Sequence, residues 1–279
     1  VTGVQTCALP ICAGVTALQA RGVLSGAYGL DWSPVAFVTA VDAANPSRLA
    51  NLSILTPLAA GETMTLGTAL GGVGTAGSKP LLVRAAGPAL GALGVPGTLP
   101  DPKLELLSGT SVIAANDDWG GSPQLAAAFA SVGAFPYASA ASNDAAVFNQ
   151  GLAAGNYTVR ISGNGSGTVI AELYDATSPT TFTLATPRLV NVSVLKQINA
   201  GESLTAGFVV VGSGPKRVLI RAVGPGLAPL GVVGTMADPQ LALNAAGVAR
   251  PLDTNNDWGG GGDLADAFRS VGEIGRAHV

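Results

Sequence analysis

The chain has 279 residues and a formal net charge of −3; only 11% of its side chains are charged, whereas 48% are hydrophobic and 39 residues are glycine. Charged residues make up roughly a quarter of an ordinary soluble domain, so this chain is too apolar to be intrinsically disordered. The sequence contains no basic cluster, which argues against nucleic acid as a partner. Glycine, proline or arginine interrupts every long apolar run, so we expect no transmembrane segment.

Both ends of the chain resemble translated sequencing adapter. The ending EIGRAHV can be encoded by GAGATCGGAAGAGCACACGTC, and the reverse complement of its GATC-onward part lies inside a coding sequence for the opening VTGVQTCALPI. A signal peptide fits the opening poorly, because it has no basic start and Pro10 interrupts its apolar run. We therefore expect residues 1–12 and 273–279 to be adapter-derived, and the remainder to be an internal fragment of a longer protein.

This interpretation removes most of the reactive side chains. His278 is the only histidine and, like Cys7, lies in an adapter-like end, while Cys12 lies at the junction. Without a histidine, the Ser-His-Asp and Cys-His arrangements of hydrolases and histidine-based metal sites are excluded. A single cysteine forms neither a disulfide framework nor a thiolate metal site.

The sequence repeats itself. RLANLSILTPLAAGETMTLG from Arg48 matches RLVNVSVLKQINAGESLTAG from Arg188, and LVRAAGP, NDDWGG and LAAAFASVG recur later as LIRAVGP, NNDWGG and LADAFRSVG. A long repeat of this kind predicts tandem domains. We predict the tail of a preceding repeat at 13–47, a complete repeat (the first copy) at 48–187 and a truncated repeat (the second copy) at 188–272. Other repeats of the same chain are then its first expected partners.

Short apolar runs with period-two spacing follow one another through the first copy, separated by Gly, Pro, Asn and Asp. This pattern is typical of an antiparallel β-sandwich. The expected strands are 49–55, 64–70, 81–85, 104–106, 111–114, 145–148, 157–161 and 169–174.

One helix interrupts the strands. Ser122 is a suitable N-cap, Pro123 suits the first helical position and Gly133 suits the end. Between them, Leu125, Phe129 and Val132 fall on one face, and the second copy repeats the pattern with Leu264, Phe268 and Val271. The predicted fold class is all-β: tandem, jelly-roll-like antiparallel β-sandwich repeats with one short helix per repeat, whose apolar face plugs one end of the sandwich.

The most polar turn of each copy is a candidate calcium site. Clustered Asp and Asn oxygens suit Ca²⁺, which takes six to eight oxygen ligands. An aspartate before proline in each copy could add a ligand. The alternative is an Asx-type turn in which these side chains cap the backbone, and no ligand spacing as strict as that of an EF-hand is present. The candidate metal ligands are Asn116, Asp117, Asp118 and Asp101 in the first copy and Asn255, Asp257 and Asp238 in the second.

Catalysis by this turn is not expected. Glycosidases use two carboxylates that face the same glycosidic bond. Asp117 and Asp118 are a pair of carboxylates, but neighbouring residues on an extended chain point to opposite faces. The second copy also has Asn256 in place of the first carboxylate. The loop GGVGTAGSK lacks the residue order of a phosphate-binding loop, and GPALGALG and SGNGSG are interpreted as turns. We therefore predict that the chain is not an enzyme and has no cofactor other than a possible Ca²⁺.

Two aromatic residues and two arginines have competing interpretations. Trp119 and Trp258 could stack on sugar rings, but aromatic residues make up only 5% of the chain, so we favour packing beneath the polar turn. Arg84 and Arg221 lie in apolar strand motifs, where a buried arginine needs a carboxylate partner. For Arg84 the candidate partners are Asp101 and Asp118.

The motif series RLxNxS, VLIRAxGPxL, DPxL, NDDWGG, AFxxVGAFP and GNYTVRISG followed by VIAELYDA resembles a repeat of large secreted or surface proteins of verrucomicrobial and related bacteria. The second half of the repeat is also similar to bacterial pre-peptidase C-terminal domains, which place calcium near acidic turns. Both resemblances imply a secreted or cell-surface location and a non-catalytic accessory role.

Two functions follow as expectations. The first is a repeat module that serves as a spacer, adhesion or protein-interaction region. The second is a carbohydrate-binding or calcium-stabilised accessory module of a secreted hydrolase. The external partner would be an extracellular glycan or protein.

Overall fold

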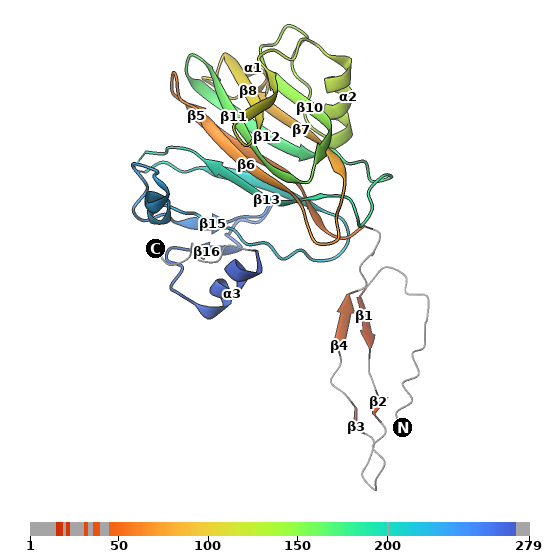
Figure 1. The fold of residues 1–279 in the computed structure, drawn as a ribbon. Coiled ribbons are helices and arrows are strands. Elements are labelled where there is room, and N and C mark those ends of the chain that lie inside the picture. Colours follow the sequence, from red (N-terminus) through yellow and green to blue (C-terminus); the bar gives the residue numbers. More distant parts are fainter. Residues whose placement is uncertain are drawn as a thin grey trace. The chain divides into compact units, whose positions relative to one another are not determined.

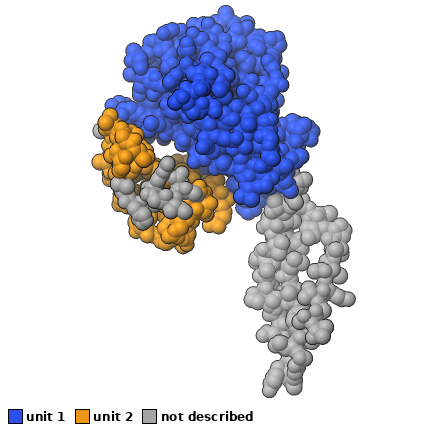
Figure 2. Space-filling model, viewed as in Figure 1, with its two compact units in different colours: residues 1–216 blue, residues 217–279 orange. Residues whose placement is uncertain are grey.

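The computed structural model describes residues 45–199 and 201–271, together with the backbone of four short strands between residues 15 and 39. The adapter-like ends, 1–12 and 273–279, lie outside the described residues. The fold is all-β and antiparallel, as predicted. The chain divides into two compact units, 1–216 and 217–279, coloured separately in Figure 2. The predicted repeat boundaries stay predictions, since this division falls at neither of them.

Ten strands of the first unit share one hydrogen-bonded sheet (Figure 1). They are β5 (Arg48–Leu58), β6 (Met64–Gly71), β7 (Ser78–Ala86), β8 (Asp101–Ser108), β9 (Ser111–Asn116), β10 (Ala145–Ala153), β11 (Gly155–Asn164), β12 (Gly167–Asp175), β13 (Arg188–Leu195) and β14 (Thr205–Val211). Each of the eight strands expected in the first copy lies within one of β5 to β12, so these predictions are confirmed. Alternation of apolar and polar residues is a local property, and it was sufficient to locate the strands.

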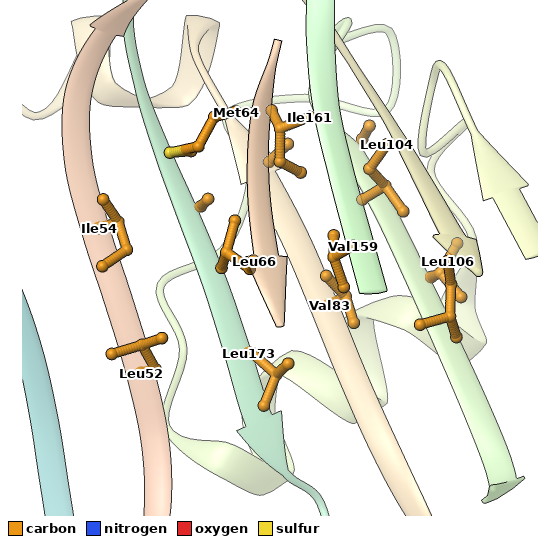
Figure 3. Close-up of a cluster of buried hydrophobic side chains, with 14 of the residues drawn as sticks. Leu52, Ile54, Met64, Leu66, Val83, Leu104, Leu106, Val159, Ile161 and Leu173 are labelled. Carbon is orange, nitrogen blue, oxygen red and sulfur yellow. The ribbon is translucent and has the colours of Figure 1, made fainter. Parts of the chain in front are cut away.

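The strand order is β10-β7-β12-β5-β13-β6-β11-β8-β9, and β14 also pairs with β5. Only Leu49 and Leu189 pair between β5 and β13, so the sheet has two halves joined at this point. The inner faces of both halves contribute to one core, into which Ile54, Leu66 and Val159 point (Figure 3). All three are fully buried, and each such side chain contributes about 1.5–3 kcal/mol relative to an exposed one.

The strands β13 and β14 belong to the second copy by sequence but pair with strands of the first. β13 pairs with β6 from Arg188 to Leu195, and β14 pairs with β5 from Thr205 to Val211. The first two strands of the second copy, which do not pair with each other, therefore complete the sheet that the first copy begins.

The predicted helix forms as α2 (Pro123–Val132). The Ser122 hydroxyl accepts a hydrogen bond from the Leu125 amide at 3.4 Å, and Gly133 ends the helix in the left-handed conformation at φ 71°. Phe129 packs against Leu82, whose neighbours along β7 face the inner core. The helix thus covers the outer face of the β7–β10–β12 half, and the expectation that it plugs one end of the sandwich is wrong.

Two glycine-rich segments were both expected to be turns. SGNGSG contains the turn between β11 and β12 at Gly165 and Ser166, while its other residues end β11 and begin β12. GPALGALG instead contains a short helix, α1 (Pro88–Ala92), which begins at a proline suited to the first helical turn. Five residues are too few to show an apolar period, which is why the pattern did not reveal it.

The second unit contains η1 (Pro225–Leu230), β15 (Leu241–Leu243), β16 (Asp253–Asn255) and α3 (Gly262–Ser270). β15 and β16 pair as β8 and β9 do in the first copy, with Leu241 opposite Asn255 as Leu104 is opposite Asn116. Near the start of the chain, β1 (Val15–Leu18) pairs with β4 (Ala36–Thr39) and β2 (Arg21–Gly22) pairs with β3 (Asp31–Trp32).

Candidate functional site

The polar turn of the first copy follows β9 and is organised by Asn116. Its Oδ1 accepts a hydrogen bond from the Ala146 amide at 2.9 Å, and its Nδ2 donates to the Asp118 carbonyl oxygen at 2.8 Å. The side chain therefore ties the turn to β10 and closes it, although in an Asx turn the side-chain oxygen would instead accept the amide two residues further on. In the second unit, Asn255 Nδ2 likewise donates to the Asp257 carbonyl oxygen, at 3.1 Å.

The carboxylates of this turn are exposed. Asp117 Oδ2 lies 4.0 Å from Lys103 Nζ, and Asp118 points to solvent. Asp101, at the start of β8, accepts a hydrogen bond from Asn164 Nδ2 at 2.5 Å. Of these carboxylates, Asp117 lines a polar pocket, together with Lys103, Ser162, Gly163 and Asn164.

The turn offers a cation fewer ligands than its composition suggested. The Asn116 oxygen already accepts a backbone amide, and the Lys103 ammonium next to Asp117 repels a cation. Asp238 and Asp257 of the second unit are exposed. Across the described residues, no three Asp, Glu, His or Cys side chains are grouped so as to hold a metal ion. Calcium binding by the polar turn of either copy stays a prediction.

Trp119 packs beneath the turn. Its ring centroid lies 5.9 Å from that of Phe129 and 5.5 Å from that of Tyr137, and its Nε1 donates to the Ser139 carbonyl oxygen at 2.9 Å. In the second unit, Trp258 lies 5.9 Å from Phe268 in the same way. Both indoles contact the aromatic residue of the following helix, which agrees with the packing interpretation rather than with an open stacking platform.

The aromatic cluster surrounds a fully buried arginine. The guanidinium of Arg84 lies 4.4 Å from the ring centre of Phe129, 4.3 Å from that of Phe135 and 4.6 Å from that of Tyr137. Its Nη1 lies 3.2 Å from Glu172 Oε2, and its Nη2 donates to the Phe135 carbonyl oxygen at 2.8 Å. A cation over aromatic faces gains electrostatic stabilisation that grows when water is excluded.

Burial of Arg84 was predicted, but its partner was not. Neither Asp101 nor Asp118 pairs with it; the partner is Glu172 on the adjacent strand β12. The motif VIAELYDA contained the signal, because Glu172 alternates with core residues along an otherwise apolar strand. Burial raises the pKa of Glu172, while Arg84 and a 2.7 Å hydrogen bond from the Tyr174 hydroxyl oppose the shift.

The sequence reasoning missed a second buried charge cluster. Lys79 Nζ lies 2.5 Å from Asp175 Oδ2, and Arg48 Nε lies 3.9 Å from the same oxygen. Phe182 covers Arg48, with the guanidinium 3.9 Å from the ring centre. Burial lowers the pKa of Lys79, and the charge of Asp175 opposes that shift. Three strands, β5, β7 and β12, are joined by these groups.

Asp144 is also buried and was not anticipated. Its carboxylate accepts hydrogen bonds from the amides of Gly87 at 2.7 Å and Ala89 at 3.1 Å, and from the hydroxyl of Ser142. It therefore satisfies the free amides at the start of α1. Ordinary turn chemistry around SNDAA gave no sign of this role, because the capped helix lies more than fifty residues earlier.

Taken together, the ionisable groups of the first unit that lie away from water hold strands and helices in place. Across residues 45–199 and 201–271, no helix is long and apolar enough to cross a membrane. Comparison with known proteins finds no match: no family model, no curated protein and no solved structure is significantly similar to this chain.

Proposed function

We propose that the chain is part of a repeat module of a large secreted or surface bacterial protein and serves as a non-catalytic spacer, adhesion or protein-interaction region. The observation that carries the proposal is the pairing of β13 and β14 with β6 and β5. Because each copy supplies strands to the sheet of the other, neighbouring copies stabilise each other in pairs, and such pairs suit an array of repeats. The resemblance of the motif series to secreted and surface repeats supports the same role.

The placement of charge also supports a scaffold. Arg84 with Glu172, and Lys79 with Asp175, lie inside the protein and pair with each other. Their geometry explains them as structural links between strands, and leaves recognition to exposed residues. A module of this kind would serve as a spacer between other parts of the protein rather than through reactive side chains.

Scattering from chains of increasing length tests the spacer role. Chains in which residues 48–187 are inserted two or four more times before Arg188 keep an even number of opening strand pairs, so each copy should keep the pairing seen here. Small-angle X-ray scattering should then show the maximum dimension growing by a constant increment with each insertion. A dimension that stops growing, as in a chain that folds back on itself, would exclude the spacer role.

The alternative function is a carbohydrate-binding or calcium-stabilised accessory module. The polar pocket beside Asp117 favours the carbohydrate-binding form of it, because the carboxylate, the Asn164 amide and the Lys103 ammonium there can all hydrogen-bond to sugar hydroxyls. Titration calorimetry with Ca²⁺ should give heat that is lost in Asp117→Asn, with Asp263→Asn, an exposed acidic residue of α3 outside the candidate ligands, as the control. No heat and no shift in melting temperature at millimolar calcium would exclude the metal.

Glycan binding is tested separately. A glycan array should show binding by the chain that is lost in Trp119→Ala if the indole contacts sugar. Phe129→Leu is the matched control, since it disturbs the same aromatic cluster and keeps the indole. Equal loss in both variants would assign the effect to folding, and no binding by the unmodified chain would leave the spacer role alone.

A further inference from the structure

The pairing between the two copies is reciprocal. Ser53 of β5 pairs with Gly207 of β14, and Ser193 of β13 pairs with Gly67 of β6. Ser193 and Gly207 occupy the positions in the second copy that Ser53 and Gly67 occupy in the first. Each copy therefore pairs its first strand with the second strand of the other copy, in the same register on both sides.

Each of the two hairpin-like segments, 48–71 and 188–211, keeps its own turn, although its two strands do not pair with each other. The Glu62 amide donates to the Ala59 carbonyl oxygen at 3.0 Å, and the Glu202 amide donates to the Asn199 carbonyl oxygen at 3.0 Å. In each turn the glutamate carboxylate also accepts the amide three residues earlier, at 2.9 Å for Ala59 and 3.0 Å for Asn199. If a hairpin closed on itself in the register seen here, Ser53 would pair with Gly67. The observed arrangement exchanges these partners between copies.

Close glycine–serine contacts occur in both of the strand pairings that join the two copies. A Cβ atom on Gly67 would lie 2.6 Å from Ser193 Oγ, and a Cβ on Gly207 would lie 3.1 Å from Ser53 Oγ. Glycine at each site lets the opposite serine approach closely. One side carries an additional ion pair, between Glu62 and Lys196.

The hairpin 188–211 also covers apolar surface of the first copy. Leu189 is buried in the inner core, and Val192, Val194 and Leu204 pack against it. Without this hairpin, β5 and β6 would present unpaired backbone edges beside exposed core residues. Such edges readily pair with another strand.

We propose that the edges of β5 and β6 form a docking surface for the opening hairpin of a second copy of this chain, so that two chains associate by exchanging their 188–211 segments. The 188–211 segment repeats the sequence pattern of the strands that it pairs with, and exchange of an identical element between chains is a low-cost route to dimers. This inference deepens the proposed scaffold function, because it names the partner that the repeat recognises. Its test measures strand pairing, so it can fail while the scattering result stands.

Paired cysteines in the full chain report which strands are neighbours, with Cys7→Ser and Cys12→Ser as background. The exchanged arrangement predicts disulfides within one chain for Gly67→Cys with Ser193→Cys and for Ser53→Cys with Gly207→Cys. Self-closed hairpins predict them for Ser53→Cys with Gly67→Cys and for Ser193→Cys with Gly207→Cys. Disulfides in the second set and not in the first would overturn the exchange.

Association between chains is measured by mixing two variants that carry one introduced cysteine each. Gly67→Cys and Ser193→Cys chains are unfolded together, refolded at increasing protein concentration and then oxidised. We expect a covalent heterodimer on non-reducing gels, increasing with concentration and several-fold above a Ser53→Cys and Ser193→Cys mixture, whose positions pair in neither arrangement. Heterodimer no greater than in this control would show that the surface does not accept a second chain.

Discussion

At the scale of single residues, the buried charged side chains of the first unit should affect its stability more than the exposed ones do. Arg84 is fully buried and touches Glu172, Phe129, Phe135 and Tyr137. Removing one partner of a buried ion pair leaves the other charged in a medium of low polarity, which costs more than the pair itself contributes. Arg160, which pairs with Glu105 while 45% of its side chain is exposed, provides the contrast.

Replacing this arginine should be costly. We expect Arg84→Met to lower the free energy of unfolding by about 3–5 kcal/mol, because it leaves Glu172 buried without its cation. Arg160→Met should lower it by about 0–1 kcal/mol, since its pair is solvated. Urea unfolding measures both, and Arg84→Met combined with Glu172→Leu should recover part of the loss. Unchanged stability in Arg84→Met would refute the buried pair.

The Glu172 carboxyl should also make the free energy of unfolding depend on pH. Burial raises the pKa of Glu172, so the folded state holds this proton more tightly than the unfolded state does. Its contribution to stability is then greatest in acid and decreases as the pH rises past 4.5, its ordinary pKa. The unfolding free energy of the unmodified chain minus that of Glu172→Gln should fall over this range. A difference that rises with pH would contradict the direction of the shift.

At the scale of elements, the RAxGP motif places a helix start against a loop. A methyl group on Gly87 would lie 2.0 Å from the Leu99 carbonyl oxygen, and one on Gly224 would lie 2.0 Å from the Met236 carbonyl oxygen. The obstacle is backbone in both copies, so it cannot be relieved by turning a side chain. The glycine therefore permits α1, and likewise η1, to lie against the chain that follows.

We expect Gly87→Ala to destabilise the protein by about 1–3 kcal/mol or more, because the loop or the helix must move apart. Gly91→Ala is the matched control: it lies in α1, and its nearest neighbour, Thr98 Oγ1, would be 3.9 Å from the new methyl group. That control should be neutral or stabilising by about 0.5–1 kcal/mol. Thermal unfolding of both variants tests the pair, and equal effects would argue against the clash.

At the scale of the whole molecule, one core unites strands from both halves of the sheet. Leu66 is fully buried on β6, while Leu55 on β5 is 43% exposed. The hairpin 188–211 lies along both strands, so its order depends on the same core. Loss of packing at β6 should therefore also destabilise β13.

Leu66→Ala should cost about 2–5 kcal/mol, as expected for a large-to-small change in a packed core. Hydrogen exchange should quicken in β13 as well as in β11, the two neighbours of β6. Leu55→Ala should leave both exchange rates close to those of the unmodified chain. Faster exchange confined to β11 would show that β13 is held by other contacts.

Much of this fold can be predicted from interactions between residues that are neighbours in the sequence. Alternating residues located β5 to β12, and Ser122, Pro123 and Gly133 marked α2, because strand period and helix caps depend on neighbours in sequence. A turn closed by its own polar side chains was among the alternatives at Asn116, but the bond from the Ala146 amide joins residues thirty positions apart.

Contacts between distant residues were decided only by the tertiary structure. The sequence indicated a buried arginine but not that Glu172, rather than Asp101 or Asp118, lies beside it. Alternation indicated that Ser53 and Gly67 lie on strands, but the same alternation fits a hairpin closed on itself and one exchanged with Gly207 and Ser193. Two copies with equal strand patterns offer equal local pairings, so only the packing of the whole chain selects between them.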